Sequence, residues 1–289
     1  TANIIDGKSI AKKIRSEIKD QVDLIADKDD QVPGLAVIQV GQDPASSVYV
    51  RNKRMACKEV GMNSFNYDLE VDVSADHLLK LIKELNKNDE VTGILVQLPL
   101  PEHINETIVI ESIDPKKDVD GFHPENAGLL SIGRPRFIPC TPKGIMFMLK
   151  HFKVELNGKH VVVIGRSNIV GRPVSVLSSL KELGNATVTI CHSGTSDLKY
   201  FTKQADVIVA AMGSPEFLDA SYIKEGACLI DVGINRILRD EKSKIVGDVN
   251  ESSVTGKASS LSPVPKGVGP MTIAMLVENT VLSAELLLN

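Results

Sequence analysis

The chain has little of several features that mark particular protein classes. It carries 33 lysines and arginines against 37 aspartates and glutamates, a net charge of −4, so the basic face of a nucleic-acid-binding protein is not expected. No apolar run approaches the roughly 18 residues of a membrane span. The N-terminus, residues 1–5, lacks the basic and apolar regions of a signal peptide, although a leader already removed stays an open alternative.

Cysteine is also scarce. The four cysteines, Cys57, Cys140, Cys191 and Cys228, are too far apart in the sequence to form a C-x-x-C pair. Cys191 and Cys228 lie in apolar, strand-like runs, where a buried free thiol is typical. We therefore predict a reducing compartment such as the cytoplasm, no disulfide framework and no metal site.

The remaining composition is typical of a globular protein. With 289 residues, 43% of them hydrophobic, the chain suffices for one large or two modest domains. Apolar strands alternate with amphipathic helical periods, which predicts an α/β fold with parallel sheets, and residues 122–140 are expected to be irregular. The expected strands are 35–40, 65–69, 93–97, 160–164, 186–191, 206–210 and 227–232. The expected helices are 7–26, 44–60, 74–88, 104–112, 141–151, 170–184, 196–204, 219–224 and 271–288.

One stretch, residues 161–173, has the order of a dinucleotide-binding turn. A buried strand ends at Gly165, and a helix containing Gly171 begins near Val170. Backbone N–H groups and the helix dipole at such a turn hold a pyrophosphate. The spacing departs from G-x-G-x-x-G, because Ser167 replaces the second glycine and the last glycine comes one residue late. Taken alone, the pattern fits a tight strand–helix turn equally well.

The second strand of this half suggests which dinucleotide binds. NAD sites usually place an aspartate or glutamate at the end of that strand, to bind the ribose 2′-hydroxyl. Here the strand ends in Cys-His-Ser-Gly-Thr, residues 191–195, without an acid. Arg166 and Ser193 are available for a 2′-phosphate instead, which favours NADP. The alternative for Arg166 is a solvent-exposed side chain at a loop tip.

Four polar residues in the N-terminal half are candidates for chemistry. Tyr49 and Lys53 are four apart on one expected helix and share a face. Gln97 ends a strand before a proline loop, where ligands gather in open α/β sheets. Asp120 lies in a turn-rich segment. Each has a plain structural reading when taken alone: a surface lysine beside a half-buried tyrosine, a strand-end cap, and a carboxylate that caps its own turn.

Their combination is far more specific. Five motifs occur in order: Tyr-Val-Arg-Asn-Lys at 49–53, Val-Gln-Leu-Pro-Leu-Pro at 96–101, Lys-Asp-Val-Asp-Gly-Phe-His at 117–123, Gly-Arg-Ser-Asn-Ile-Val-Gly at 165–171, and Gly-Val-Gly-Pro-Met-Thr at 267–272. Together they resemble the bifunctional methylenetetrahydrofolate dehydrogenase/methenyltetrahydrofolate cyclohydrolase family, from Asp6 to the final helix.

The resemblance implies a two-lobed protein, with a folate-binding catalytic domain of residues 1–144 plus 271–289 and a Rossmann-like NADP-binding domain of residues 145–270. It implies a cytoplasmic homodimer in one-carbon metabolism and purine biosynthesis, with folate bound in the cleft. It makes Lys53 the catalytic residue and places Tyr49 in the folate site. In the same resemblance Gln97 contacts the lysine, and Asp120 binds the pterin. Further folate-site positions are Val96, Leu98, Pro265, Gly267 and Gly269. Cofactor positions are Gly165, Arg166, Ser167, Gly171, Ser193 and Ile234.

The implied reactions suit these residue types. Hydride leaves the methylene carbon because adjacent nitrogen lone pairs stabilise the resulting cation, so that step needs alignment more than a proton acceptor. Hydrolysis of the methenyl group moves protons, for which Lys53 is suited. A carboxylate such as Asp120 matches the paired N–H edge of the pterin.

Two alternatives and one departure remain. A dehydrogenase without cyclohydrolase activity, possibly NAD-linked, is the first alternative, and a nucleotide-binding regulatory protein without turnover is the second. The departure is Lys266, because the family loop usually reads Pro-Gly-Gly-Val-Gly-Pro and this chain has Pro-Lys-Gly-Val-Gly-Pro at 265–270. A lysine at a glycine position puts the local backbone conformation in question, and the added cation either attracts an anionic substrate or stays solvated.

Overall fold

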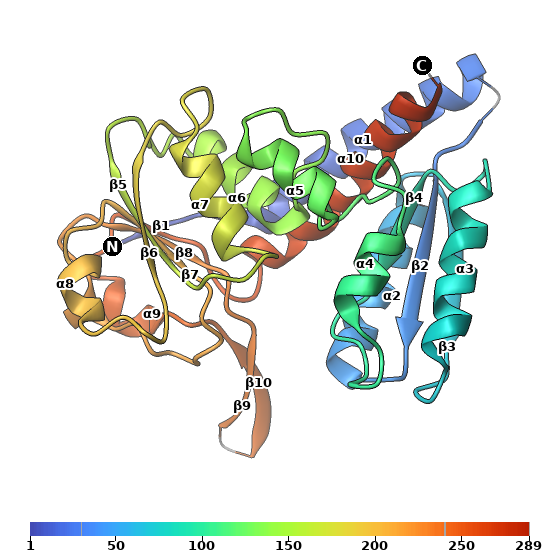
Figure 1. Cartoon of the computed structure of the whole chain (residues 1–289). Coiled ribbons are helices and arrows are strands. Elements are labelled where there is room, and N and C mark those ends of the chain that lie inside the picture. The colour runs from blue at the N-terminus through green and yellow to red at the C-terminus, as the bar shows by residue number, and fades with distance from the viewer. Residues whose placement is uncertain (30, 240, 289) are drawn as a thin grey trace. The chain divides into compact units, whose positions relative to one another are not determined.

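The protein, a computed structural model, is described for residues 1–29, 31–239 and 241–288, without the side chains of residues 29 and 45 (Figure 1). The chain divides into two compact units. The first unit comprises Thr1–Ala11 and Thr141–Thr272, and the second comprises Lys12–Cys140 and Ile273–Asn289. Each contains its own parallel sheet, which confirms the predicted two-lobed α/β class. The domain boundaries implied by the resemblance stay a prediction.

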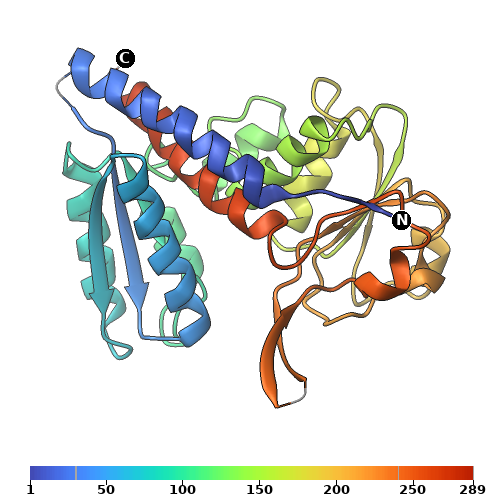
Figure 2. The same ribbon diagram turned by 180° about the vertical axis from the view of Figure 1, so that it is seen from behind.

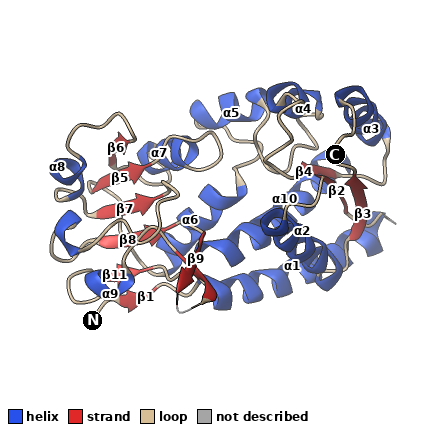
Figure 3. Ribbon diagram, turned by 90° about the horizontal axis from the view of Figure 1, so that it is seen from below, coloured by secondary structure: helices blue, strands red, loops and turns tan. Residues whose placement is uncertain are grey.

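The second unit is built on a three-stranded parallel sheet. Its central strand β2 (Gly34–Val40) lies between β3 (Asn63–Leu69) and β4 (Gly93–Val96). Helices α3 (Ala75–Lys87) and α4 (Glu106–Ser112) cover one face, and α2 (Pro44–Glu59) covers the other (Figure 3). Strands β2 and β4 are apolar because both of their faces are covered, whereas β3 carries polar residues and is exposed to half-buried. Ligands of open parallel sheets bind at the carboxyl ends of the strands, so a site is expected at that edge.

Helix α2 starts where the sequence predicts. The Asp43 side chain accepts a hydrogen bond from the Ser46 N–H at 2.8 Å, and Pro44 occupies the first turn. Gly61 follows the helix with a φ of +81°, the left-handed conformation that glycine adopts at helix ends. These two signals fix the position of Tyr49 and Lys53 along the helix.

Two long helices, α1 (Gly7–Asp29) and α10 (Val268–Leu288), run side by side (Figure 2). By length and composition α10 is able to cross a membrane, but 56% of its most apolar window is buried within the protein. A core helix passes the same test of length and composition. Its buried residues include Ala274, Met275 and Val277.

The expectation that residues 122–140 are irregular is wrong for α5 (Pro124–Ser131). Its first turn is capped by the His123 Nδ1, which accepts the Glu125 N–H at 3.0 Å. The helix is held by the fully buried Asn126, whose Nδ2 donates to Pro115 O and to Asp118 Oδ2, both at 2.8 Å. A helix stabilised by buried polar contacts has no apolar period to reveal it.

The first unit contains a six-stranded parallel sheet in the order β1-β11-β8-β7-β5-β6. Its strands are β1 (Asn3–Ile4), β5 (His160–Ile164), β6 (Thr187–Cys191), β7 (Val207–Ala210), β8 (Cys228–Asp231) and β11 (Ser260–Leu261). Its helices are α6 (Cys140–His151), α7 (Gly171–Ser179), α8 (Leu198–Thr202), the 3₁₀ turn η1 (Ala220–Tyr222) and α9 (Glu251–Val254). Helix α7 ends five residues earlier than expected, because the Leu180 carbonyl accepts N–H groups of a turn over 183–185.

An antiparallel hairpin, β9 (Asn235–Arg239) with β10 (Lys242–Val246), also belongs to this unit and was not predicted. Most of its side chains are exposed, so its sequence lacks the apolar alternation of a buried strand. The two-residue strands β1 and β11 were likewise too short to give a pattern.

The strand order contains a switch point. From β5 the chain crosses to β6 on one side, and from β6 it crosses back to β7 on the other side of β5. Ligands of open α/β sheets bind outside the carboxyl ends of the strands at such a point. In this sheet that place is formed by the residues after β5 and β7.

Candidate active site and dinucleotide site

Lys53 and Gln97 are joined directly. The Lys53 Nζ donates to Gln97 Oε1 at 3.0 Å. The Gln97 side chain is oriented by its own Nε2, which donates to Leu98 O at 2.8 Å, and its backbone N–H donates to Ile38 O at 2.9 Å. Because the amide nitrogen is already engaged, the amide oxygen faces the lysine. The predicted contact between a helix residue and a strand-end residue is present.

Asp120 lies in the same unit and has an unusual carboxyl group. Removal from bulk water raises the pKa of Asp120 to about 6, although the positive charge of Lys53 lowers it. The turn is capped by a different residue: Asp118 Oδ2 accepts the His123 N–H at 2.8 Å. The plain reading of Asp120 as the cap of its own turn is therefore wrong, and its carboxylate stays available for a ligand.

Two side chains that the sequence did not single out support Asp120. The Cys140 Sγ lies 3.7 Å from Asp120 Oδ1 and 3.5 Å from Val119 O, in position to donate to either. From α10, the Asn279 Nδ2 donates to Val119 O and to Ile138 O, both at 2.9 Å. Asn279 is fully buried on this mostly apolar helix, and a polar residue in such a run is a sequence signal for a supporting role.

The other predicted folate positions of this unit lie on α2 and at the end of β4. Tyr49 is half-buried one turn before Lys53, and burial raises the pKa of its phenol, which keeps it neutral. Val96 ends β4 and is buried, and Leu98 follows Gln97. The arrangement joins a cation, an amide, a phenol and a carboxyl group of raised pKa, which suits proton transfer on a polar heterocycle.

The first unit carries the glycine turn. Gly165 has a φ of +126°, and a side chain there would collide with Ala211 O. A side chain on Gly171 would collide with Gly165 O. The two glycines therefore serve close packing of the strand end against the helix start, which is one of the functions that glycines have in a dinucleotide-binding turn.

Ser167 has a role that the sequence did not suggest. Its Oγ accepts the Val170 N–H at 3.0 Å and lies 3.4 Å from the Gly171 N–H, so it caps α7. Within the described part of the chain, the N–H groups of residues 166–169 donate to no protein acceptor. The N–H groups that are free to bind a pyrophosphate therefore belong to the loop, because Ser167 already engages those at the start of α7.

The loop after β6 suits an additional phosphate. Arg166 and Ser193 are exposed, and Arg166 Nη1 lies 3.4 Å from His192 Nε2. His192 is in turn held by the Gly194 N–H, which donates to its Nδ1 at 3.1 Å. Arg166, His192 and Ser193 provide a cation, an imidazole and a hydroxyl, and residues 191–195 contain no carboxylate. This set of groups fits a 2′-phosphate better than a ribose diol.

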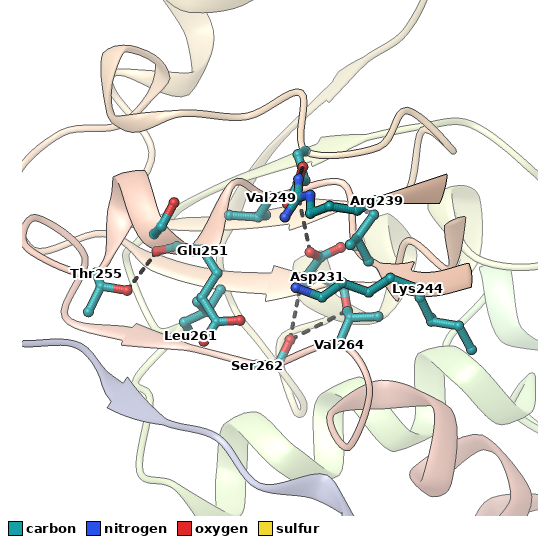
Figure 4. Close-up of a pocket in the computed structure, with 14 residues that line it drawn as sticks. Asp231, Arg239, Lys244, Val249, Glu251, Thr255, Leu261, Ser262 and Val264 are labelled. Carbon is teal, nitrogen blue, oxygen red and sulfur yellow. Dashed lines mark hydrogen bonds and ion pairs between the residues drawn. The ribbon is translucent and has the colours of Figure 1, made fainter. Parts of the chain in front are cut away.

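Two buried carboxylates beyond the predicted set lie beside this sheet edge. Asp231 ends β8 and Asp248 follows β10, and Figure 4 shows Asp231 at the wall of a cavity of about 310 Å³ with Arg239 and Lys244. Burial raises the pKa of Asp231 to about 7. Hydrogen bonds from backbone N–H groups lower this pKa, and the charge of the Asp248 carboxylate raises it further. An acid at the end of an apolar strand was visible in the sequence, whereas Asp248 gave no signal. Ile234, a predicted cofactor contact, lies between them in sequence and is exposed.

The proline–glycine loop precedes α10 in the first unit. Gly267 is packed so tightly that a side chain would collide with Pro263 O, whereas Pro265 and Gly269 lie near the surface. Lys266 has a φ of +90°, and its carbonyl accepts the Lys8 N–H at 2.9 Å. The backbone therefore adopts a left-handed conformation that favours glycine, although the residue is a lysine.

This conformation gives a stability prediction. Lys266→Gly is expected to stabilise the protein by about 1 kcal/mol, because a residue with a side chain is strained at a positive φ. Lys266→Ala is the matched control, since it removes the charge and keeps the strain. Thermal unfolding followed by circular dichroism compares the two. Equal midpoints for the glycine and alanine variants would contradict strain at this position.

Among the residues that the structure describes, no group of three or more histidine, cysteine, aspartate or glutamate side chains is placed to hold a metal ion. Among the described residues all four cysteines are buried, and none is in a disulfide bond.

Comparison with known proteins identifies the family. The family model for the tetrahydrofolate dehydrogenase/cyclohydrolase catalytic domain matches residues 5–120, and that for the NAD(P)-binding domain matches residues 139–287. The chain is 55% identical to the bifunctional protein FolD of Agathobacter rectalis over 97% of this chain and 98% of that protein.

Solved structures agree. The chain resembles bifunctional FolD of Campylobacter jejuni, with a TM-score of 0.94 and 48% identity over 99% of both chains. It also resembles FolD of Trypanosoma brucei complexed with NADP cofactor and inhibitor, with a TM-score of 0.95 and 36% identity over 100% of this chain and 99% of that one. The chain therefore belongs to the tetrahydrofolate dehydrogenase/cyclohydrolase family.

Proposed function

We propose that this protein is a bifunctional folate enzyme that uses NADP. It oxidises 5,10-methylenetetrahydrofolate to 5,10-methenyltetrahydrofolate and hydrolyses the product to 10-formyltetrahydrofolate. The observation that carries the proposal is the Lys53–Gln97 hydrogen bond in the unit that also holds Asp120. A dehydrogenase alone does not need a positioned amine, whereas a cyclohydrolase does.

The second unit supplies the folate site in this proposal. The Asp120 carboxylate accepts N–H groups of the pterin, and the Tyr49 ring lies against the flat ring system. Gln97 holds the Lys53 amine in place, so that the amine exchanges protons with the attacking water and the departing nitrogen. Val96 and Leu98 contribute the walls beside Gln97.

In the first unit, the residues after β5 and β6 supply the dinucleotide site. The free N–H groups of residues 166–169 face the pyrophosphate, and Arg166 with Ser193 binds the 2′-phosphate. The Ile234 backbone and the glycines at 165 and 171 complete the contact surface, and Pro265, Gly267 and Gly269 of the same unit stay predicted folate positions. When bound, NADP accepts the hydride, and the protein has only to hold it in line with the methylene carbon.

The proposal extends to the cell. We infer a cytoplasmic homodimer that provides one-carbon units for purine biosynthesis, without a nucleic-acid or membrane partner. Four buried cysteines that form no disulfide and a net charge of −4 support this setting. Light scattering of the purified protein tests the dimer: a mass twice the 31.3 kDa of the chain is expected, and the mass of a single chain would contradict it.

The function itself is tested by analysing products. Methylenetetrahydrofolate and NADP are incubated with the purified protein, and the folates are separated by chromatography. Both reduced NADP and 10-formyltetrahydrofolate are expected, at rates above those of a protein-free mixture. If methenyltetrahydrofolate accumulates and decays no faster than in a protein-free mixture, the protein is a dehydrogenase alone.

Cofactor choice gives a separate prediction. Arg166→Ala is expected to weaken the binding of NADP by about 1.5–3 kcal/mol, because a charge-assisted hydrogen bond to the 2′-phosphate is lost. NAD turnover should change little. Arg172→Ala is a matched control, because Arg172 is also exposed and bonds to Asn168 Oδ1 at 3.1 Å. KM values for both cofactors decide it, and an equal loss for NAD and NADP would assign Arg166 to loop support.

A further inference from the structure

Asp248 collects hydrogen bonds from two separate loops. It is fully buried. Its Oδ2 accepts the Met212 N–H at 2.8 Å and the Gly213 N–H at 3.0 Å, and its Oδ1 accepts the Ser214 N–H at 2.9 Å. Asn235 adds a fourth donor, because its Nδ2 lies 2.9 Å from Oδ1. One carboxylate thus ties the loop after β7 to the loop after β8.

The loop after β7 lies at the switch point of the sheet. It begins at Ala211, whose N–H donates to Ile164 O at 2.8 Å and whose carbonyl leaves no room for a side chain on Gly165. The glycine turn and residues 211–214 are therefore packed against each other. Any displacement of this loop alters the place where a dinucleotide binds.

Asp231 fixes Asp248 in turn. Its Oδ1 accepts the N–H groups of Gly233 at 3.0 Å and Asp248 at 2.9 Å, and its Oδ2 accepts the Val249 N–H at 2.9 Å. Side chains at Gly233 and Gly247 would collide with these carboxylates. The neighbouring acids repel each other, and seven N–H donors offset that repulsion.

We propose that Asp248 is a positioning residue of the dinucleotide site, holding residues 212–214 and 235 in the geometry that binds the cofactor. The inference rests on the proposed function, because it takes NADP as the occupant. Asp248 itself contacts no reacting atom. It acts through the loops whose backbone N–H groups it accepts, so its removal should affect cofactor binding and spare hydrolysis of methenyltetrahydrofolate.

Asp248→Asn is the variant that tests this. An amide has one acceptor oxygen, so its NH₂ group faces either the Met212 and Gly213 donors or the Ser214 and Asn235 donors. Buried donors without an acceptor make the bound loop geometry less populated. We expect Kd and KM for NADP to rise by about tenfold to hundredfold. Cyclohydrolase activity without cofactor should stay within about twofold of the wild type.

The matched control is Asp206→Asn, in the same sheet but at the amino ends of its strands. Asp206 Oδ2 accepts the His160 N–H at 2.8 Å, and Oδ1 accepts Lys224 Nζ at 2.6 Å. This variant weakens hydrogen bonds at the opposite edge of the sheet, so its affinity for NADP should match that of the wild type. Asn235→Ala is a milder second variant, because it removes only one donor to Asp248. It should raise KM for NADP severalfold and carries the test if Asp248→Asn does not fold.

NADP affinity is measured by calorimetry, and both activities are measured on the same samples. Selective loss of NADP affinity in Asp248→Asn and Asn235→Ala, with cyclohydrolase kept, supports the positioning role. Unchanged NADP affinity, or a parallel fall of both activities, overturns it. A wild-type protein that binds NADP but turns over no folate would refute the proposed function and leave the positioning role measurable by calorimetry alone.

Discussion

Lys53→Met should lower the enzymatic hydrolysis of methenyltetrahydrofolate by about 10²–10⁴-fold, the usual contribution of a positioned acid–base group. The side chains have similar length, so packing around α2 is preserved, while the donor to Gln97 Oε1 is lost. Oxidation of methylenetetrahydrofolate should fall much less, because hydride transfer needs no proton acceptor. The two activities of one variant therefore separate.

The decay of methenyltetrahydrofolate without NADP measures the first activity, and NADP reduction measures the second. Arg51→Met is the matched control: Arg51 lies on the same helix and is exposed on a different face. It should keep both activities. Near-wild-type hydrolysis by Lys53→Met would remove this lysine from the mechanism.

Asp120→Asn should raise KM for the folates of both reactions by about tenfold to hundredfold, because a charged acceptor for the pterin is replaced by an amide. Burial that raises the pKa of Asp120 also makes its ionised form costly in the folded state. Removing that charge should leave thermal stability at neutral pH equal or higher. Loss of binding without loss of stability distinguishes an anchor from a structural residue.

The pH dependence follows from the same group. The pKa of Asp120 is raised to about 6, so the carboxylate is ionised above that pH and takes up a proton below it. Folate KM of the wild type should therefore rise as the pH falls through about 6. In Asp120→Asn this rise should vanish. A variant with the same pH profile as the wild type, or with only one activity affected, would contradict a shared anchor.

Helices and strands whose apolar residues recur periodically, and whose ends carry capping residues, were predicted well, because local chemistry determines them. Asp43, Pro44 and Gly61 set the ends of α2, and the buried runs of β2, β4 and β5 set the sheets. The polar helix α5 and the exposed hairpin of β9 and β10 escaped, because tertiary contacts and not periodicity hold them.

The candidate site divides in the same way. Lys53, Gln97 and Asp120 were found because their residue types recur in ordered motifs. Their supports were not found: Cys140 contacts Asp120, and Asn279 donates to the carbonyl of the preceding Val119 from far along the chain. Ser167 stays a predicted cofactor position, and its hydrogen bond to the start of α7 was not foreseen. Such partners depend on long-range pairing, which no local pattern encodes.

One measurement tests the central claim most directly, that a single chain carries both reactions with NADP. Absorbance of methenyltetrahydrofolate is followed after adding the protein to methylenetetrahydrofolate with NADP, with NAD, and to methenyltetrahydrofolate without cofactor. The proposal predicts formation with NADP in preference to NAD, and decay faster than in buffer without cofactor. Formation that requires NAD, or decay no faster than in buffer, would contradict it.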